Sequence, residues 1–405
     1  MKEKKTKKKW IKFRHRIVRN ILYCILKPYS RIKYGIKIEK FKEHNGRQYL
    51  ILLNHQTPFD QFFTGMAFKG AVYYLATEDI FSMGWVSSVI KYLVAPIPIK
   101  KQTTDVHAVI NCIRVVKEGG TIAIAPEGNR TYSGRTEYMN PSIAFLAKKL
   151  GLPIAIFRIE GGYGVEPRWS DKTRRGKMRG YVSRVIEPEE YMSMDNDALH
   201  KLIAEELYVD EARADACFYS KRSAEYLERL IYICPKCGLS TFKSYGDTVE
   251  CTKCHLKAKY LPTKEFASED GLPFRFVADW YDYQKDFMNS LDVTEYKATP
   301  LFKDSASFSE VIVYKNKQML RKEADITLYG DRVVVDEGGA DEITFRFDDV
   351  TAASVLGRNK LNIYHDKRVY QLKGDKSFNA IKYVHTYYRY KNIIKGDENG
   401  QFLGL

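Results

Sequence analysis

Apolar residues between positions 49 and 187 alternate between short runs and helical spacings. Several short runs have the length and β-branched content of buried strands. These runs are 49–53, 71–76, 97–99, 121–125 and 154–159. Between them, apolar residues recur every three or four positions, most clearly over 106–118, where two glycines end the pattern. Strands that alternate with helices predict an α/β domain with a mixed sheet flanked by helices.

The pattern changes past about residue 305, where short β-rich runs are separated by turn signals. We expect strands at 311–314, 326–329, 332–335, 343–347, 361–364 and 369–372. A last helix is expected over 378–392. This order resembles a pleckstrin-homology-like barrel in pattern only. Lipid headgroup binding, protein contact and a purely structural role all stay open for it. Residues 196–230 are expected to be helical.

The N-terminal arm is predicted to be a basic amphipathic helix that Pro28 ends. Its apolar residues recur at spacings of three or four and are Trp10, Phe13, Ile17, Ile21 and Ile25. Residues 1–37 hold fourteen Lys or Arg against Glu3 alone, so this arm carries most of the net charge of +16. A basic helix with such a stripe suits an anionic membrane surface. The alternative is an ordinary docking helix with a solvated basic face.

The rest of the composition indicates where in the cell we expect the protein. The chain has 405 residues, 44% of them hydrophobic, and no apolar run near the roughly 20 residues of a spanning helix. We see no secretory signal. Its seven cysteines do not suggest a disulfide framework and favour a reducing compartment. We expect a peripheral or monotopic protein on the cytoplasmic face of the cell membrane.

A histidine and an aspartate follow the first apolar run. In Asn54–Asp60, His55 and Asp60 are five positions apart, which on a regular helix places them about 140° apart. They can meet only if the chain turns between them, and Pro58, with Thr57 as helix cap, supplies that break. An imidazole oriented by a carboxylate is a general base near neutral pH. Alternatively, Asp60 only completes a helix start and His55 is a hydrogen-bonded loop residue.

A second motif follows the run at 121–125. Its sequence is Pro126-Glu127-Gly128-Asn129-Arg130. A glycine in such a turn lets the backbone pass close to a ligand, and an arginine can hold a phosphate with two parallel hydrogen bonds. The alternative is a turn whose arginine pairs with a surface acid.

Together the two motifs resemble the glycerolipid acyltransferase family, which includes lysophosphatidic-acid acyltransferases. The family's His, four residues, Asp pattern is matched by His55 and Asp60. Its Pro-Glu-Gly-Thr-Arg pattern is matched by Glu127, Gly128 and Arg130, with Asn129 in place of Thr. Lys101 stands where the family has a phosphate-binding arginine, which puts bidentate binding there in doubt.

The resemblance implies a mechanism. His55 takes the proton of a lysophospholipid hydroxyl, with lysophosphatidic acid the expected acceptor, and Asp60 orients His55. The acyl donor is acyl-CoA or acyl carrier protein, and no redox cofactor is expected. Arg130 and Lys101 hold the acceptor phosphate, while Glu127 and Gly128 shape that site. Glycerol 3-phosphate and other lysophospholipids stay open as acceptors.

Four cysteines form two C-x-x-C pairs, which predict a zinc ribbon. The ligands are Cys234, Cys237, Cys251 and Cys254. Four thiolates suit tetrahedral zinc, and a site closed by four protein ligands is structural. Redox cysteines and an iron centre are minor alternatives.

We therefore expect five segments: a membrane-surface helix (1–30), an acyltransferase domain (31–228), a zinc ribbon (229–262), a linker (263–304) and a β-rich domain (305–405). The rival function is an inactive acyltransferase-like adaptor that binds lipid or nucleic acid through the basic arm and the ribbon. Nucleic acid is the less favoured partner, because the ribbon lacks a dense stripe of basic and aromatic residues.

Overall fold

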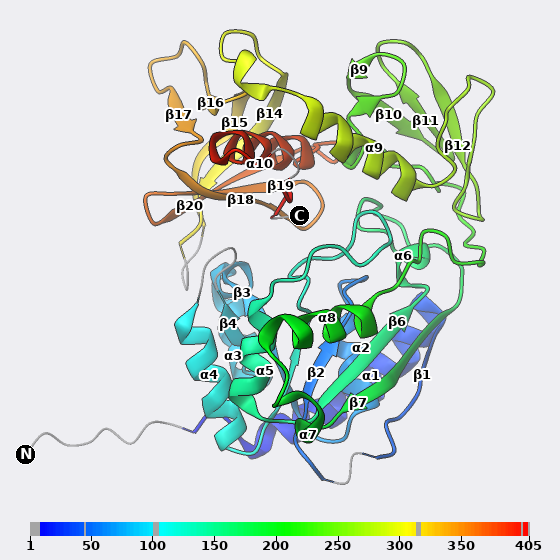
Figure 1. Cartoon of the computed structure of the whole chain (residues 1–405), viewed down its shortest axis with the longest axis vertical. Helices are drawn as coiled ribbons and strands as arrows, with labels where there is room; N and C mark the ends of the chain where they lie inside the picture. The colour runs from blue at the N-terminus through cyan, green and yellow to red at the C-terminus, as the bar shows by residue number, and fades with distance from the viewer. Residues whose placement is uncertain (1–8, 44–45, 100–104, 313–316, 398–399, 404–405) are drawn as a thin grey trace, which may run out of the picture. The chain divides into compact units, whose positions relative to one another are not determined.

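The computed structural model describes residues 9–43, 46–99, 105–312, 317–397 and 400–403 (Figure 1). It divides into two compact units, each built from separate stretches of chain. The first contains the described residues up to Gly128, with Met139–Glu160 and Met178–Tyr208. The second contains Asn129–Tyr138, Gly161–Lys177 and the described residues from Val209 onward. Beside this division, the five segments expected from the sequence stay a prediction.

The first unit is built on a seven-stranded mixed sheet with the strand order β1-β7-β6-β2-β5-β3-β4. Its neighbours are parallel except β6 and β7, which are antiparallel. The strands are β1 (Ile36–Ile38), β2 (Leu50–Leu53), β3 (Val72–Thr77), β4 (Ile97–Ile99), β5 (Thr121–Ile124), β6 (Ile154–Glu160) and β7 (Met178–Ile186). The predicted mixed sheet is confirmed, although β1 and β7 were not predicted.

Helices cover both faces of this sheet. They are α1 (Phe13–Tyr34), α2 (Asp60–Ala67), α3 (Trp85–Leu93) after the 3-10 turn η1 (Glu78–Ser82), α4 (Val106–Lys117), α5 (Ser142–Leu150), α7 (Pro188–Tyr191) and α8 (Asn196–Leu207). Right-handed crossovers place α2 and α3 on one face and α4 and α5 on the other. The helix α1 contacts α2 and α3, whereas α5 contacts α4 and α8. The central strand β2 is fully buried.

The N-terminal helix differs from the prediction in two respects. It continues through Pro28 to Tyr34 and ends at Gly35, which adopts the left-handed conformation. A proline is tolerated here because Cys24, whose carbonyl loses its helical donor, is exposed to water. Trp10 precedes the helix and packs against the core, where its Nε1 donates to the Ala95 carbonyl at 3.0 Å.

Among the described residues, no helix combines the length and the apolar character that crossing a bilayer requires.

The second unit begins with small strands around the cysteine pairs. They are β8 (Ile233–Cys234), β9 (Gly238–Leu239), β10 (Phe242–Tyr245), β11 (Thr248–Cys251), β12 (Lys257–Tyr260) and β13 (Phe266–Ala267), with α6 (Gly162–Val165) and the 3-10 turn η2 (Leu227–Arg229) before them. One expectation was wrong here: the helix expected over 196–230 ends at Leu207. The segment expected to be a linker contains α9 (Val277–Ser290).

The C-terminal part of this unit is a seven-stranded antiparallel sheet that nearly closes into a barrel. Its order is β17-β16-β15-β14-β20-β19-β18, and a final helix, α10 (Ile381–Lys395), follows it. The strands are β14 (Phe302–Glu310), β15 (Gln318–Leu328), β16 (Arg332–Val335), β17 (Ile343–Arg346), β18 (Val350–Leu356), β19 (Lys360–His365) and β20 (Arg368–Gly374), with the 3-10 turn η3 (Val293–Glu295) before β14. The predicted β-rich barrel is confirmed. The strand expected at 311–314 was misplaced: β14 ends at Glu310, and residues 313–314 lie outside the described residues.

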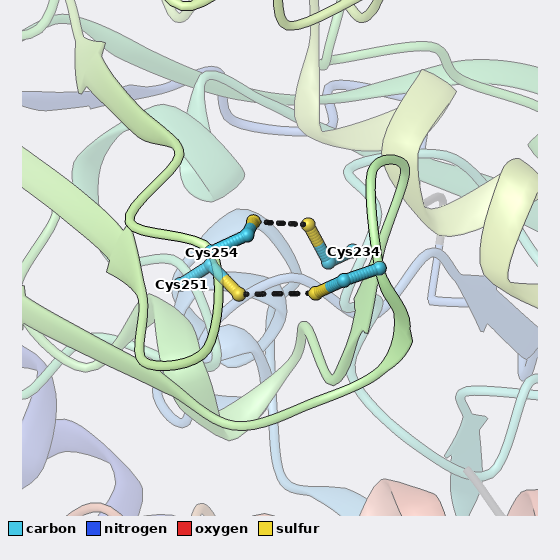
Figure 2. Close-up of side chains that lie close together, drawn as sticks. Cys234, Cys251 and Cys254 are labelled. Atoms are coloured by element: carbon cyan, nitrogen blue, oxygen red, sulfur yellow. Dashed lines mark hydrogen bonds between the residues drawn. The ribbon is translucent and has the colours of Figure 1, made fainter.

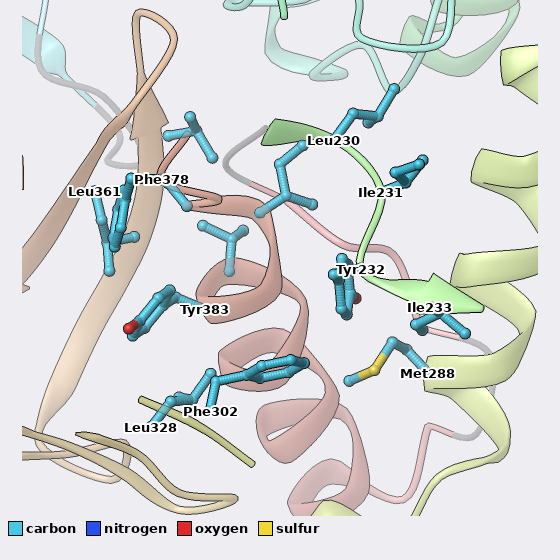
Figure 3. Close-up of a cluster of buried hydrophobic side chains, with 14 of the residues drawn as sticks. Leu230, Ile231, Tyr232, Ile233, Met288, Phe302, Leu328, Leu361, Phe378 and Tyr383 are labelled. Atoms are coloured by element: carbon cyan, nitrogen blue, oxygen red, sulfur yellow. The ribbon is translucent and has the colours of Figure 1, made fainter. Parts of the chain in front are cut away.

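One hydrophobic core joins the cysteine region to the barrel. Figure 3 shows Leu230–Ile233 packed beside Met288 of α9, Phe302 of β14 and Tyr383 of α10. These side chains are almost completely buried. The cysteine region and the barrel therefore share one core within the second unit.

Candidate functional site

A tight corner at the carboxyl end of β2 brings His55 and Asp60 together. The strand ends at Leu53, six residues make the turn, and Asp60 is the first residue of α2. His55 Nδ1 lies 2.8 Å from Asp60 Oδ2. The chain therefore makes the turn between His55 and Asp60 that the sequence predicted.

The Asp60 carboxylate is completely buried, and it accepts several hydrogen bonds from the turn that precedes it. Its donors are the backbone N–H of Gln56 at 2.6 Å, the backbone N–H of Thr57 at 2.9 Å and the Thr57 hydroxyl at 2.6 Å. The N-terminus of α2 adds the favourable end of a helix dipole. The expected cap was wrong in detail: Phe59 is the N-cap, and the Thr57 hydroxyl accepts from its N–H at 3.1 Å.

This arrangement selects the tautomer of His55. A carboxylate surrounded by donors remains an acceptor, so His55 Nδ1 carries the proton that it shares with Asp60. The lone pair is then on Nε2, which has no hydrogen-bond partner in the part of the chain that the structure describes. The His55 side chain is 16% exposed. Its Nε2 is therefore a base open to a substrate proton.

Two further side chains hold this corner, and sequence reasoning did not give them this role. Both amide atoms of Asn54 pair with Ile159, one accepting from its N–H and one donating to its carbonyl, each at 2.8 Å. Asn54 thus continues the pairing of β2 with β6 beyond the end of the strand. Glu127 Oε1 accepts from the His55 N–H at 2.9 Å. The carboxylate of the second motif therefore fixes the backbone of the first.

Gly128, Arg130 and Lys101 were also expected at the phosphate site, and the structure describes the first two. Gly128 has a φ of 71°, which favours glycine in this turn. Arg130 belongs to the second unit, where burial and the neighbouring guanidiniums of Arg168 and Arg358 lower its pKa to about 10. Lys101 lies outside the described residues. The structure therefore joins Glu127 to His55 and places Arg130 among other arginines.

The four cysteines of the two C-x-x-C pairs gather at one point in the second unit. Their Sγ atoms all lie within 4.8 Å of one another. Cys234 Sγ lies 3.5 Å from Cys254 Sγ, a pair that Figure 2 shows. Cys237 Sγ lies 3.6 Å from Cys251 Sγ. Four sulfur ligands around one point fit a tetrahedral metal ion.

The surroundings of these thiols act on them differently: burial raises the pKa of Cys234 and Cys237, whereas the pKa of Cys251 is lowered, which favours its thiolate form. Burial alone raises the pKa of Cys251, but the N–H groups of Cys254 and Lys253 and the Ser240 hydroxyl lower it to about 6. Ser240 Oγ lies 3.1 Å from Cys251 Sγ. The donor set therefore fits a bound cation.

A family model covers the stretch of chain that carries both motifs. Residues 35–159 match the family model described as Acyltransferase. Among solved structures, the chain is similar to the 1-acyl-sn-glycerophosphate (LPA) acyltransferase PlsC from Thermotoga maritima, at 18% identity and a TM-score of 0.39. That match covers 48% of this chain and 79% of the other.

Proposed function

Residues 35–159 belong to the acyltransferase family, and on that premise we propose that the protein esterifies a lysophospholipid at a membrane surface. The proposed acceptor is lysophosphatidic acid and the product is phosphatidic acid. The donor is a fatty acyl thioester of coenzyme A or acyl carrier protein. The observation that carries the proposal is the His55–Asp60 pair at 2.8 Å, with His55 Nε2 left without a hydrogen-bond partner among the residues that the structure describes.

The proposed chemistry needs one proton carrier and no covalent acyl-enzyme. His55 Nε2 takes the proton of the acceptor hydroxyl as its oxygen attacks the thioester carbonyl. The C–O bond forms, the C–S bond breaks, and the imidazolium returns the proton to the leaving thiolate. Asp60 stabilises the imidazolium through Nδ1 and keeps the ring in the required tautomer.

The apolar surface of α1 supports the membrane part of the proposal. Its outward side exposes Phe13, Ile17, Ile21, Ile25 and Ile32, of which Phe13 is 76% exposed. Exposed cations lie between them, including Arg16, Lys27 and Arg31. An apolar ridge flanked by cations suits the headgroup region of an anionic leaflet, which in the cell is the cytoplasmic face.

The adjacent helix α3 supports the same placement. It exposes Trp85, Val89 and Tyr92 at helical spacing, and Trp85 is 77% exposed. Arg14 of α1 stacks 3.9 Å above the Tyr92 ring and donates to the Tyr92 carbonyl at 2.9 Å. Tryptophan is enriched at membrane interfaces. We therefore assign the interfacial tryptophan to Trp85, because Trp10 packs inside.

A test of the activity incubates the full chain with a labelled acyl thioester and a panel of lysolipids, and identifies the product by mass. We expect lysophosphatidic acid to be acylated, and His55→Ala to lower the rate by about 10²–10⁴-fold while the melting temperature stays near that of the wild type. A His55→Ala variant that acylates at the wild-type rate would refute the mechanism. Vesicle binding with no acylation of any acceptor would favour the adaptor function instead.

Membrane attachment is tested with vesicles that contain an anionic phospholipid. Trp85→Ser should weaken binding by more than about tenfold, because it removes the burial of a large apolar side chain. Tyr245→Ser is the matched control, since Tyr245 is an exposed aromatic residue of the second unit. Equal loss with both variants would contradict the assignment of α1 and α3 to the interface.

We further propose that the four-cysteine site holds a structural zinc ion. Cys234, Cys237, Cys251 and Cys254 provide four thiolate ligands, which close the coordination shell. The site would stabilise the loops that carry the cysteines. It takes no part in the proposed acyl transfer.

A further inference from the structure

A cluster of four guanidiniums, only partly paired with acids, lies within the second unit. Arg130, Arg168, Arg229 and Arg358 come from four different segments of the chain. Arg168 and Arg229 are each only 2% exposed. Buried charges are stable only when they are paired or bound to a counter-ion, so the acids near this cluster decide its meaning.

Two carboxylates face these four cations in the contacts of the described residues. Arg358 Nη2 lies 2.5 Å from Glu166 Oε1, and its Nη1 lies 3.6 Å from Asp171. Arg229 Nη1 lies 2.7 Å from Asp171 Oδ1. The cluster therefore keeps an excess of positive charge.

Arg168 joins the two segments that carry the other cations. Its Nη1 donates to the Arg130 carbonyl at 2.8 Å. Its Nε donates to the Gly357 carbonyl at 3.1 Å and its Nη2 to the Val355 carbonyl at 3.2 Å, at the turn between β18 and β19. The guanidinium is planar and its donors have fixed directions. Arg168 therefore fixes the backbone of Arg130 relative to the turn that carries Arg358.

Three buried donors around this clamp lack an acceptor among the described residues. They are Arg130 Nη1, Arg358 Nε and the Tyr132 hydroxyl. The Tyr132 ring lies under the Arg168 guanidinium, 4.0 Å from centroid to Cζ, and Tyr132, Arg168 and Arg358 all act electrostatically on Arg130. Buried polar groups normally find a partner. Here the unmet groups are donors, which an anion with several oxygens satisfies.

We propose that Arg358 of the C-terminal barrel and the Tyr132 hydroxyl complete a phosphate site with Arg130, the arginine that the family resemblance already assigns to phosphate, and that Arg168 is the positioning residue. The C-terminal barrel would thereby supply a specificity residue, Arg358, beside the arginine of the Pro-Glu-Gly-Asn-Arg turn. The ligand class is a phosphomonoester: the headgroup of lysophosphatidic acid, if the proposed function holds, or a free phosphate.

The test titrates inorganic phosphate, and separately glycerol 3-phosphate, into the purified full chain by calorimetry. Arg358→Gln should weaken binding at least tenfold. Arg368→Gln is the matched control, because Arg368 is an exposed arginine of the same barrel whose nearest acid, Glu310, is 3.8 Å away. Unchanged phosphate affinity in Arg358→Gln and Arg130→Gln, with wild-type melting temperatures, would overturn the proposal whether or not the protein acylates lipids.

A kinetic arm separates the two ligand sources. With a headgroup in the site, Arg358→Gln raises KM for lysophosphatidic acid at least tenfold and leaves KM for the acyl donor unchanged. With a free phosphate in the site, Arg358→Gln loses phosphate binding and keeps the wild-type KM for lysophosphatidic acid. Both outcomes support a phosphate site, and an Arg358→Lys variant should recover part of the binding in either case.

Discussion

The His55 corner and the arginine cluster treat their charged groups in opposite ways. Asp60 is buried and its carboxylate is saturated by donors from its own turn. In the arginine cluster Arg168 and Arg229 are buried and Arg358 is 28% exposed, and the buried atoms Arg130 Nη1 and Arg358 Nε have no acceptor among the described residues. The Asp60 carboxylate has its hydrogen-bond partners within the fold and orients His55. The arginine donors without an acceptor are the ones for which we propose a phosphate ligand.

The largest expected effect breaks the saturated side of this comparison. Asp60→Asn places an amide among the N–H groups of Gln56 and Thr57 and removes the charge that supports the His55 imidazolium. We expect acyl transfer to fall by about 10²–10⁴-fold. The measurement is the rate with lysophosphatidic acid at saturating acyl donor.

Asp105→Asn is the control for this variant. Asp105 also starts a helix, accepting from the Ala108 N–H at 3.1 Å, and it is not part of the His55 corner. It should cost about 1 kcal/mol of stability or less and leave the rate unchanged. Equal rate losses in both variants would show that Asp60 acts only as part of a helix start.

A second prediction concerns the cysteine site. Like the arginine cluster, it brings groups of the same charge together in the second unit. Four thiolates repel one another unless a cation lies between them. Cys251→Ser should remove the metal and lower the melting temperature by more than about 10 °C, because several kcal/mol of folding energy depend on the ion. Metal analysis and calorimetric unfolding test this together.

Cys217→Ser is the matched control, since Cys217 is an exposed cysteine of the same unit. It should leave both metal content and melting temperature unchanged. A purified wild-type chain with less than about 0.5 zinc per molecule would contradict the site itself.

A third prediction tests how the corner is attached to the sheet. Asn54→Leu leaves the Ile159 N–H and carbonyl without partners inside the protein, which should cost about 2–4 kcal/mol. Denaturant unfolding measures this loss. Asn54 acts through the position of His55, so kcat should fall while KM for the acceptor stays constant. Asn54→Asp keeps the acceptor for the Ile159 N–H but sets a buried carboxylate oxygen against the Ile159 carbonyl, so it should recover no stability at neutral pH.

The same corner shows what sequence reasoning can reach. The separation of His55 and Asp60 and the proline between them predicted a turn that brings both together, because local chain geometry governs so short a stretch. The contacts by which Asn54 and Glu127 hold this corner were not predicted. Their partners, Ile159 and the His55 N–H, are 105 and 72 positions away, and no local pattern marks such a contact.

The second unit was less predictable for the same reason. Arg130, Arg168 and Arg358 are far apart in sequence, and each looks like an ordinary surface arginine when it is read alone. The helix α9 was missed because its polar residues hide its buried side, which includes Trp280 and Met288. The cysteines were found because metal ligation imposes a spacing that is visible in the chain.

The smallest expected effect concerns a buried base that needs no ligand. His385 is completely buried beside Tyr232, whose hydroxyl lies 2.6 Å from its Nδ1, and burial lowers its pKa to about 3. The unfolded state therefore binds the proton between pH 6.5 and about 3, and stability falls as the pH decreases through this range. From pH 7 to pH 5 the loss should be about 2 kcal/mol. The measurement is denaturant unfolding of the second unit at both pH values in wild type, His385→Gln and His255→Gln. The His385→Gln variant should lose this pH dependence, whereas His255→Gln should keep it, since His255 is exposed and paired with Glu250 at 2.9 Å. An identical pH dependence in all three proteins would mean that acids, not the buried imidazole, control the acid stability of this unit.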